Sequence, residues 1–147
     1  EFTIQDFIDL YTVLECLQAL SGRLAAQANI SLSTEMKLRN LAEKIKEAYA
    51  AGDFSTGERH SYEFHITIAE CSGNQYLKES ISNMLSKVRI MYPEKFIARI
   101  MSEEVSYRDH MRLIEHITSG NAEAAEKLSN EHVGKLRSLL IERQSYE

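Results

Sequence analysis

Most of the chemistry that this sequence offers is carried by five histidines: His60, His65, His110, His116 and His132. Three of them, His65, His110 and His132, fall on the apolar stripe of their own helical segment, where leucine or alanine would be expected. A neutral imidazole in a core needs partners for both ring nitrogens, because an unsatisfied buried polar group costs ~1–3 kcal/mol. Three such residues in one small domain require a common explanation.

A bound divalent cation provides one explanation. Neutral imidazole is the commonest metal-binding side chain, and three histidines leave at least one coordination position open. We therefore expect a divalent transition metal, zinc or nickel, at His65, His110 and His132. The spacing also fits three unrelated core histidines, each bonded to a neighbouring side chain or carbonyl. The other two histidines lie beside charged residues, and we predict that both are at the surface.

The sequence lacks the common catalytic motifs. It contains no HExxH, no glutamate followed three residues later by histidine, no GxGxxG, no Walker loop and no GxSxG. The three histidines come without an obviously placed general base. We therefore predict that the domain holds a ligand and is not an enzyme. A metal-dependent hydrolase or isomerase, which needs a base near the open coordination position, is the alternative from another class.

The elements that must position these histidines are helices, because apolar residues recur at three- and four-residue steps throughout the chain. Breaks are expected at Gly52, Ser72-Gly73-Asn74, Pro93 and Gly120-Asn121. A capping box is predicted at Ser55 to Glu58, and another helix start at Ser102. Between Pro93 and Ser102, a short apolar patch predicts a helical turn or a fifth short helix. The pattern predicts an all-α, antiparallel bundle of six or seven helices.

The bulk composition describes one soluble domain covering residues 1–147, with 44% hydrophobic and 27% charged residues. No apolar run approaches the ~20 residues of a membrane span, so we expect no membrane partner. The net charge of −5, with basic residues scattered among acidic ones, argues against direct DNA contact by this chain. Cys16 and Cys71 have no CxxC spacing, which predicts reduced core thiols in a cytoplasmic protein.

Several short motifs follow one another in an order and spacing typical of one protein family. In chain order they are Tyr11 with Leu24-Ala25-Ala26, Phe64-His65, Ser72-Gly73-Asn74 with Leu77, His110, Gly120-Asn121 with Ala124-Ala125, and His132. Together they resemble the FadR-type C-terminal, effector-binding domain of GntR-family transcriptional regulators. The resemblance extends from Ile4 to Leu140, and its specificity comes from the order of the motifs.

The resemblance implies an antiparallel helical bundle that encloses a cavity, binds a small-molecule effector and forms a homodimer. In that family a winged helix-turn-helix precedes the domain. We expect DNA to be contacted only through such an N-terminal segment, which this chain does not contain. Metal-binding members hold a divalent ion with three histidines and an aspartate, and small carboxylates often complete the coordination and alter DNA affinity. Carried over by position, the three histidines are His65, His110 and His132.

Two positions depart from the family pattern. Ser61 stands where the family has its aspartate, one helical turn before His65 on the same face. A serine hydroxyl is a poor, neutral ligand, and neighbouring Glu58 and His60 are its candidate substitutes. Leu14 stands where the family usually has an arginine, which would anchor an effector carboxylate through paired N–H donors.

We predict that Ser61 and Arg89 contact the effector, with Arg89 replacing the missing cation at position 14. The alternative for Arg89 is a surface arginine near the end of a helix. Since both departures remove polarity from the expected site, a metal-free sensor of a hydrophobic or acyl ligand is the alternative function. The leading hypothesis is a regulatory domain that senses a small carboxylate at a histidine-bound metal.

Overall fold

The computed structural model describes residues 2–91 and 103–144, with the side chains of 103–105, 140 and 143–144 left undescribed, and these residues contain six helices and no strand. The all-α fold class is confirmed. The helices are α1 (Ile4–Gln27), α2 (Leu32–Ala50), α3 (Phe54–Cys71), α4 (Gln75–Met91), α6 (Glu103–Thr118) and α7 (Ala122–Gln144). The predicted short helix before Ser102, and Ser102 itself, lie outside the described residues, as does Pro93.

Asparagine caps and glycine turns produce two of the sharpest breaks, as the sequence predicts. The Asn74 and Asn121 side chains each accept a hydrogen bond from the backbone N–H three residues on, at 3.1 and 3.2 Å, at the starts of α4 and α7. Gly73 and Gly120 precede them with φ of +70° and +73°, a conformation that only glycine adopts readily. The chain therefore reverses within a few residues and returns each helix to the bundle.

The start of α3 differs from the prediction. Asp53 is the N-cap, and its side chain accepts a hydrogen bond from the backbone N–H of Thr56. The helix therefore begins before Ser55, and the predicted capping box from Ser55 to Glu58 is wrong. The glutamate of that motif accepts a hydrogen bond from the Tyr49 hydroxyl. Glu58 is thus directed toward the interior of the bundle.

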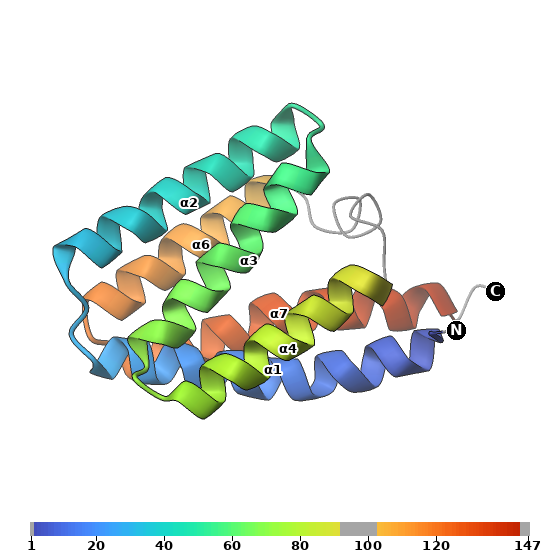
Figure 1. Cartoon of the computed structure of the whole chain (residues 1–147), viewed down its shortest axis with the longest axis horizontal. Coiled ribbons are helices and arrows are strands. Elements are labelled where there is room, and N and C mark those ends of the chain that lie inside the picture. Colours follow the sequence, from blue (N-terminus) through green and yellow to red (C-terminus); the bar gives the residue numbers. More distant parts are fainter. Residues whose placement is uncertain (1, 92–102, 145–147) are drawn as a thin grey trace.

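The helices pack in two groups (Figure 1). In the first group, α1 and α7 run side by side in opposite directions and share the most extensive contact in the bundle, while α4 packs against α1. In the second group, α2 packs against both α3 and α6. Contacts of α1 with α3 and α6 join the two groups. The key histidines are carried by α3, α6 and α7. Of these, α6 and α7 pack against each other, while α3 packs against α1 and α2, which in turn contact α7 and α6.

Three clusters of buried apolar side chains lie in the described part of the bundle. The smallest, Ala69, Leu77 and Ile81, packs α3 against α4. The other two flank the histidines. The larger one, called the apolar core below, consists of Ala25, Ala26, Leu38, Leu41, Ala42, Ile45, Phe64, Ile68, Leu113, Ile114, Ile117, Ala125 and Leu128. The smaller one joins α1, α4 and α7 and consists of Phe7, Tyr11, Leu14, Val88, Val133 and Leu136. His110 packs on Phe64 of the apolar core, whereas His132 directly precedes Val133 of the smaller cluster. The histidines thus lie between the two clusters.

The prediction for the two cysteines holds for Cys71, which packs against the apolar core, and fails for Cys16. Cys16 is exposed and Cys71 is half-buried, and both are free thiols. The prediction of core thiols is wrong for Cys16, because that residue lies on the outward face of α1 between the exposed Val13 and Leu20. None of the helices in the described part of the chain has the length and apolar character needed to cross a membrane.

Candidate functional site

The structure places the imidazoles of His65, His110 and His132 next to one another, each from a different helix. The ring centres are 5.0 Å apart for His110 and His132, 5.8 Å for His65 and His110, and 5.9 Å for His65 and His132. One nitrogen of each ring lies within 4.8 Å of the others. Two nitrogens bonded to one ion at ~2.1 Å are at most about 4.2 Å apart, so a separation within 4.8 Å is close to the spacing that a shared ion requires.

His110 is the most deeply enclosed of the three. It is 2% exposed, and the ring of Phe64 packs against it with 4.5 Å between ring centres. Neither of its ring nitrogens has a hydrogen-bond partner among the residues that the structure describes. Because a buried polar group without a partner is destabilising, this ring lacks an explanation based on protein contacts alone. An electron-pair acceptor, such as a metal ion, would satisfy a nitrogen of this ring.

The orientation of His132 is fixed by a carboxylate that sequence reasoning did not identify. The Nδ1 atom of His132 lies 3.1 Å from the carboxylate of Asp109, which also accepts a hydrogen bond from Lys135 at 2.6 Å. A carboxylate acceptor holds the proton on Nδ1 and leaves Nε2 with its lone pair available. A carboxylate behind a histidine is the usual arrangement around a metal-ligating imidazole.

The surroundings keep two of the rings neutral. Burial, followed by the charge of His132, lowers the pKa of His65 to about 3. Burial, followed by the charges of His132 and His65, holds the pKa of His110 well below its ordinary value. Burial raises the pKa of Asp109, but hydrogen bonds from His132 and Lys135 outweigh it and lower that pKa to about 2. His65 and His110 are therefore neutral at pH 7, which is the form of imidazole that binds metals.

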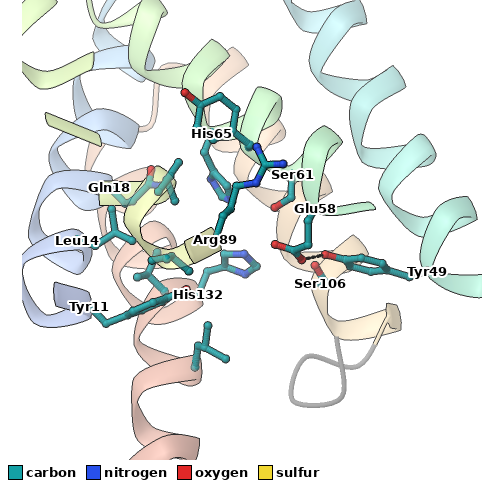
Figure 2. A pocket seen from close by; sticks show the side chains of 15 residues that line it. Tyr11, Leu14, Gln18, Tyr49, Glu58, Ser61, His65, Arg89, Ser106 and His132 are labelled. Atoms are coloured by element: carbon teal, nitrogen blue, oxygen red, sulfur yellow. Dashed lines mark hydrogen bonds between the residues drawn. The ribbon is translucent and has the colours of Figure 1, made fainter. Parts of the chain in front are cut away.

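A cavity of about 90 Å³ opens beside the histidines (Figure 2). Its walls come from α1, α3, α4, α6 and α7 and from the end of α2. The lining residues are Tyr11, Leu14, Gln18, Tyr49, Glu58, Ser61, Tyr62, His65, Leu85, Val88, Arg89, Ser106, His132, Val133 and Leu136. The cavity combines an apolar wall with a small number of polar and charged groups, which is typical of ligand-binding sites.

Both residues predicted to contact the effector line this cavity. Ser61 is half-buried on α3, and the exposed Arg89 approaches from α4 with its guanidinium carbon 5.9 Å from the centre of the Tyr62 ring. Leu14 also lines the cavity and is 1% exposed. The position that usually carries the family's arginine is thus part of an apolar wall, and Arg89 supplies a cation from another helix.

Two other polar residues of the cavity, Gln18 and Tyr49, were not singled out from the sequence. Gln18 is buried and lines the cavity together with Tyr49. Glu58 lines the cavity too, but it is outside the metal-ligating group: among the residues that the structure describes, the set of ligand atoms within 4.8 Å of one another comes from the three histidines. Glu58 lies seven residues before His65, which is two turns away on the same helix face. This spacing is the signal that could have placed it in the cavity.

The two remaining histidines stand apart from this group. His60 and His116 are half-buried, and neither belongs to the set of three converging rings. The Nδ1 atom of His60 is buried and has no hydrogen-bond partner in the described part of the chain, so the prediction of a surface ring is wrong for that residue. As a substitute for the missing aspartate, His60 receives no support from this geometry.

Comparison with known proteins gives consistent matches over most of the chain. A family model described as FCD domain matches residues 9–135. The HTH-type transcriptional regulator LutR of Bacillus subtilis (strain 168) is 25% identical over 141 residues, which cover 92% of this chain and 63% of that protein. A solved structure, Streptococcus agalactiae GntR, superposes with a TM-score of 0.75 at 22% identity and covers 89% of this chain and 57% of that one. The chain thus spans less than two thirds of the length of either protein.

Proposed function

Because this chain belongs to the FCD domain family, we propose that it is the effector-binding domain of a DNA-binding transcriptional regulator and that it senses a small carboxylate at a divalent ion. In this proposal His65, His110 and His132 hold the ion, with zinc or nickel as the metal. Ser61 and Arg89 contact the effector. The proposed regulator is cytoplasmic and dimeric, and it contacts DNA through a separate segment.

The unpaired imidazole of His110 is the observation that carries the metal assignment. Both of its nitrogens are buried without a hydrogen-bond partner, and a nitrogen of each of two other imidazoles lies within 4.8 Å of one of them. Protein contacts explain one of the three rings, that of His132, whose Nδ1 is bonded to Asp109. An ion in reach of all three rings would satisfy the available lone pairs at once.

The charge of the site favours an anionic effector. Three neutral imidazoles leave the two positive charges of a bound ion uncompensated in its first coordination sphere, since no described carboxylate lies within ligand distance of all three rings. When bound, the ion would supply an open coordination position for an oxygen ligand. Arg89 adds a second positive group at the same cavity. A small carboxylate can use both, and the Ser61 hydroxyl offers a further hydrogen bond.

Effector binding changes the affinity for DNA only if the effector binds two arrangements of the helices with different affinities. A ligand shifts an equilibrium by no more than its differential affinity for the two states. The cavity is suited to this role because α1, α3, α4, α6 and α7 all contribute to its walls. A ligand that draws Arg89 of α4 toward the histidines of α3 and α7 would change how those helices sit on one another.

Metal dependence of thermal unfolding tests the proposal. Chelator-treated protein should gain stability from Zn²⁺ or Ni²⁺, by about 2.7 kcal/mol at 100 times the dissociation constant. The variants His65→Ala and His132→Ala should lose this gain. His110→Leu is the sharper variant, because it removes two unpaired nitrogens from an apolar environment. We expect it to stabilise the metal-free protein by about 1–3 kcal/mol while its response to metal disappears.

His116→Leu, on the same helix as His110, is the matched control and should respond to metal like the parent chain. If the three site variants also respond like the parent, the metal assignment is wrong. Stabilisation by apolar acyl ligands in the presence of chelator would instead support the metal-free alternative. The matched relative is named as a transcriptional regulator, and we accordingly expect no turnover of small carboxylates, esters or phosphates by the metal-loaded protein.

A further inference from the structure

Glu58 brings a negative charge into the cavity that also contains Arg89. Its carboxylate accepts a hydrogen bond from the hydroxyl of Tyr49, at the end of α2. Figure 2 shows Glu58, Tyr49, Ser61 and Ser106 gathered on one side of the cavity, with Tyr11, Leu14 and Gln18 on the other. The cavity therefore has an acidic side, built from α2, α3 and α6, in addition to its histidines.

Glu58 lies apart from the three histidines that are proposed to bind the metal. Glu58 lies two turns before His65 on the same face of α3, which corresponds to about 10.5 Å along the helix axis. Among the described residues it does not join the set of ligand atoms within 4.8 Å of one another. Glu58 thus lies where the far end of a ligand would be if its near end were bound at the histidines.

The charge of Glu58 acts across the cavity. Burial, followed by the negative charge of Glu58, raises the pKa of Tyr11. Tyr11 belongs to α1, on the opposite wall. A second carboxylate on a ligand would be repelled by Glu58. An apolar tail would displace water from the Glu58 carboxylate without replacing its hydrogen bonds. A positively charged nitrogen would gain a charge-assisted hydrogen bond.

We propose, on the basis of the function proposed above, that the effector is a small aminocarboxylate. Its carboxylate binds at the histidine-held ion and Arg89, and its ammonium group binds Glu58. A cavity of about 90 Å³ restricts the ligand to a few carbon atoms between these two ends. Glu58 is the residue that selects the amino-bearing ligand over other carboxylates of the same length.

Calorimetric titration of the zinc-loaded chain with three matched series tests this assignment. The amino series is β-alanine, γ-aminobutyrate and δ-aminovalerate. The uncharged series is propionate, butyrate and valerate, and the diacid series is malonate, succinate and glutarate. At the best chain length we expect the amino member to bind about 10- to 100-fold more tightly than both partners, as a charge-assisted hydrogen bond provides. In Glu58→Gln this preference should fall at least about tenfold.

Glu63→Gln is the matched control, since Glu63 is an exposed glutamate of the same helix whose nearest cation is Lys37 at 3.8 Å. It should keep the parent preference. The inference is overturned if diacids or unsubstituted acids bind as tightly as the amino members, if Glu58→Gln keeps the preference, or if no member binds. Metal-dependent binding of carboxylates without an amino preference would overturn this inference and leave the carboxylate sensor standing. Failure of zinc to bind would remove the carboxylate sensor itself.

Discussion

The apolar core and the histidine cavity lie side by side in one bundle, but they differ in the kinds of side chains that they bury. In the apolar core, every member is an aliphatic or aromatic residue no more than 7% exposed. Beside it, the cavity and the histidines around it contain Arg89, Glu58 and an imidazole with two unpaired nitrogens. A folding domain gains nothing from the second arrangement in the absence of a ligand. The difference indicates that one region stabilises the bundle and the other is shaped for binding.

The same helices contribute to both regions, at positions no more than one turn apart. On α3, Phe64 belongs to the apolar core and His65 to the cavity. On α6, Leu113 and Ile114 of the apolar core follow one turn after His110. Rigid packing of the core therefore holds the imidazoles in place, which is the condition for a binding site that does not need to reorganise. Substitutions in the two regions should separate stability from binding.

The largest effect is expected from Leu38→Ala in the apolar core. Leu38 is fully buried on α2, so truncation removes buried apolar surface and leaves a cavity. Such changes typically cost 2–5 kcal/mol of the free energy of unfolding. We expect a loss of about this size in urea denaturation, while the additional stabilisation by zinc stays equal to that of the parent. A loss of the zinc effect in a folded variant would mean that the two regions are not separable.

Asp109→Asn should have the next largest effect. Here zinc affinity should change while the fold is retained. The substitution removes the negative charge that orients His132 and pairs with Lys135. Loss of such a carboxylate typically weakens metal affinity 10- to 100-fold. We expect this change in zinc titrations, with the helical content retained. Glu126→Gln, which breaks the exposed pair with Arg23, is the control for loss of one acidic charge. Equal zinc affinity in Asp109→Asn and the parent would contradict the orienting role.

The apolar core was predictable from the sequence because burial there follows helical periodicity. Leucine, isoleucine and alanine at three- and four-residue steps identify the buried face of each helix. The helix ends at Gly73 and Gly120 were also predictable, since their φ values require glycine. The convergence of the three rings was expected from their apolar stripes and from the family resemblance. Their role as metal ligands stays a proposal.

The supporting residues of the site were not predictable, because their partners come from other helices. Asp109 lies four residues before Leu113 on the buried stripe of α6 and is 3% exposed, but its spacing says nothing of its partner, which is His132 of α7. Glu58 fits a local capping motif in the sequence, whereas in the structure its partner is Tyr49 of α2. Periodicity within one helix contains no information about which neighbour covers a polar residue. Only the packing of the helices brings these pairs together.

The smallest effect is the pH dependence of the metal-free protein, which arises in the histidine region and not in the apolar core. The folded state resists protonation of His65, whose pKa is lowered to about 3, whereas an unfolded histidine titrates near 6.5. Below pH 6.5 the unfolded state therefore binds more protons, and the free energy of unfolding falls as the pH falls, by up to about 1.4 kcal/mol per pH unit for each such ring. We expect this decline in chelator-treated protein between pH 6.5 and 5, where most carboxylates stay ionised. His65→Leu should show a shallower decline, while Leu38→Ala should keep the parent slope from a lower starting value. Equal slopes in His65→Leu and the parent would mean that the fold tolerates a charged ring at this position, which a region shaped for neutral imidazoles should not do.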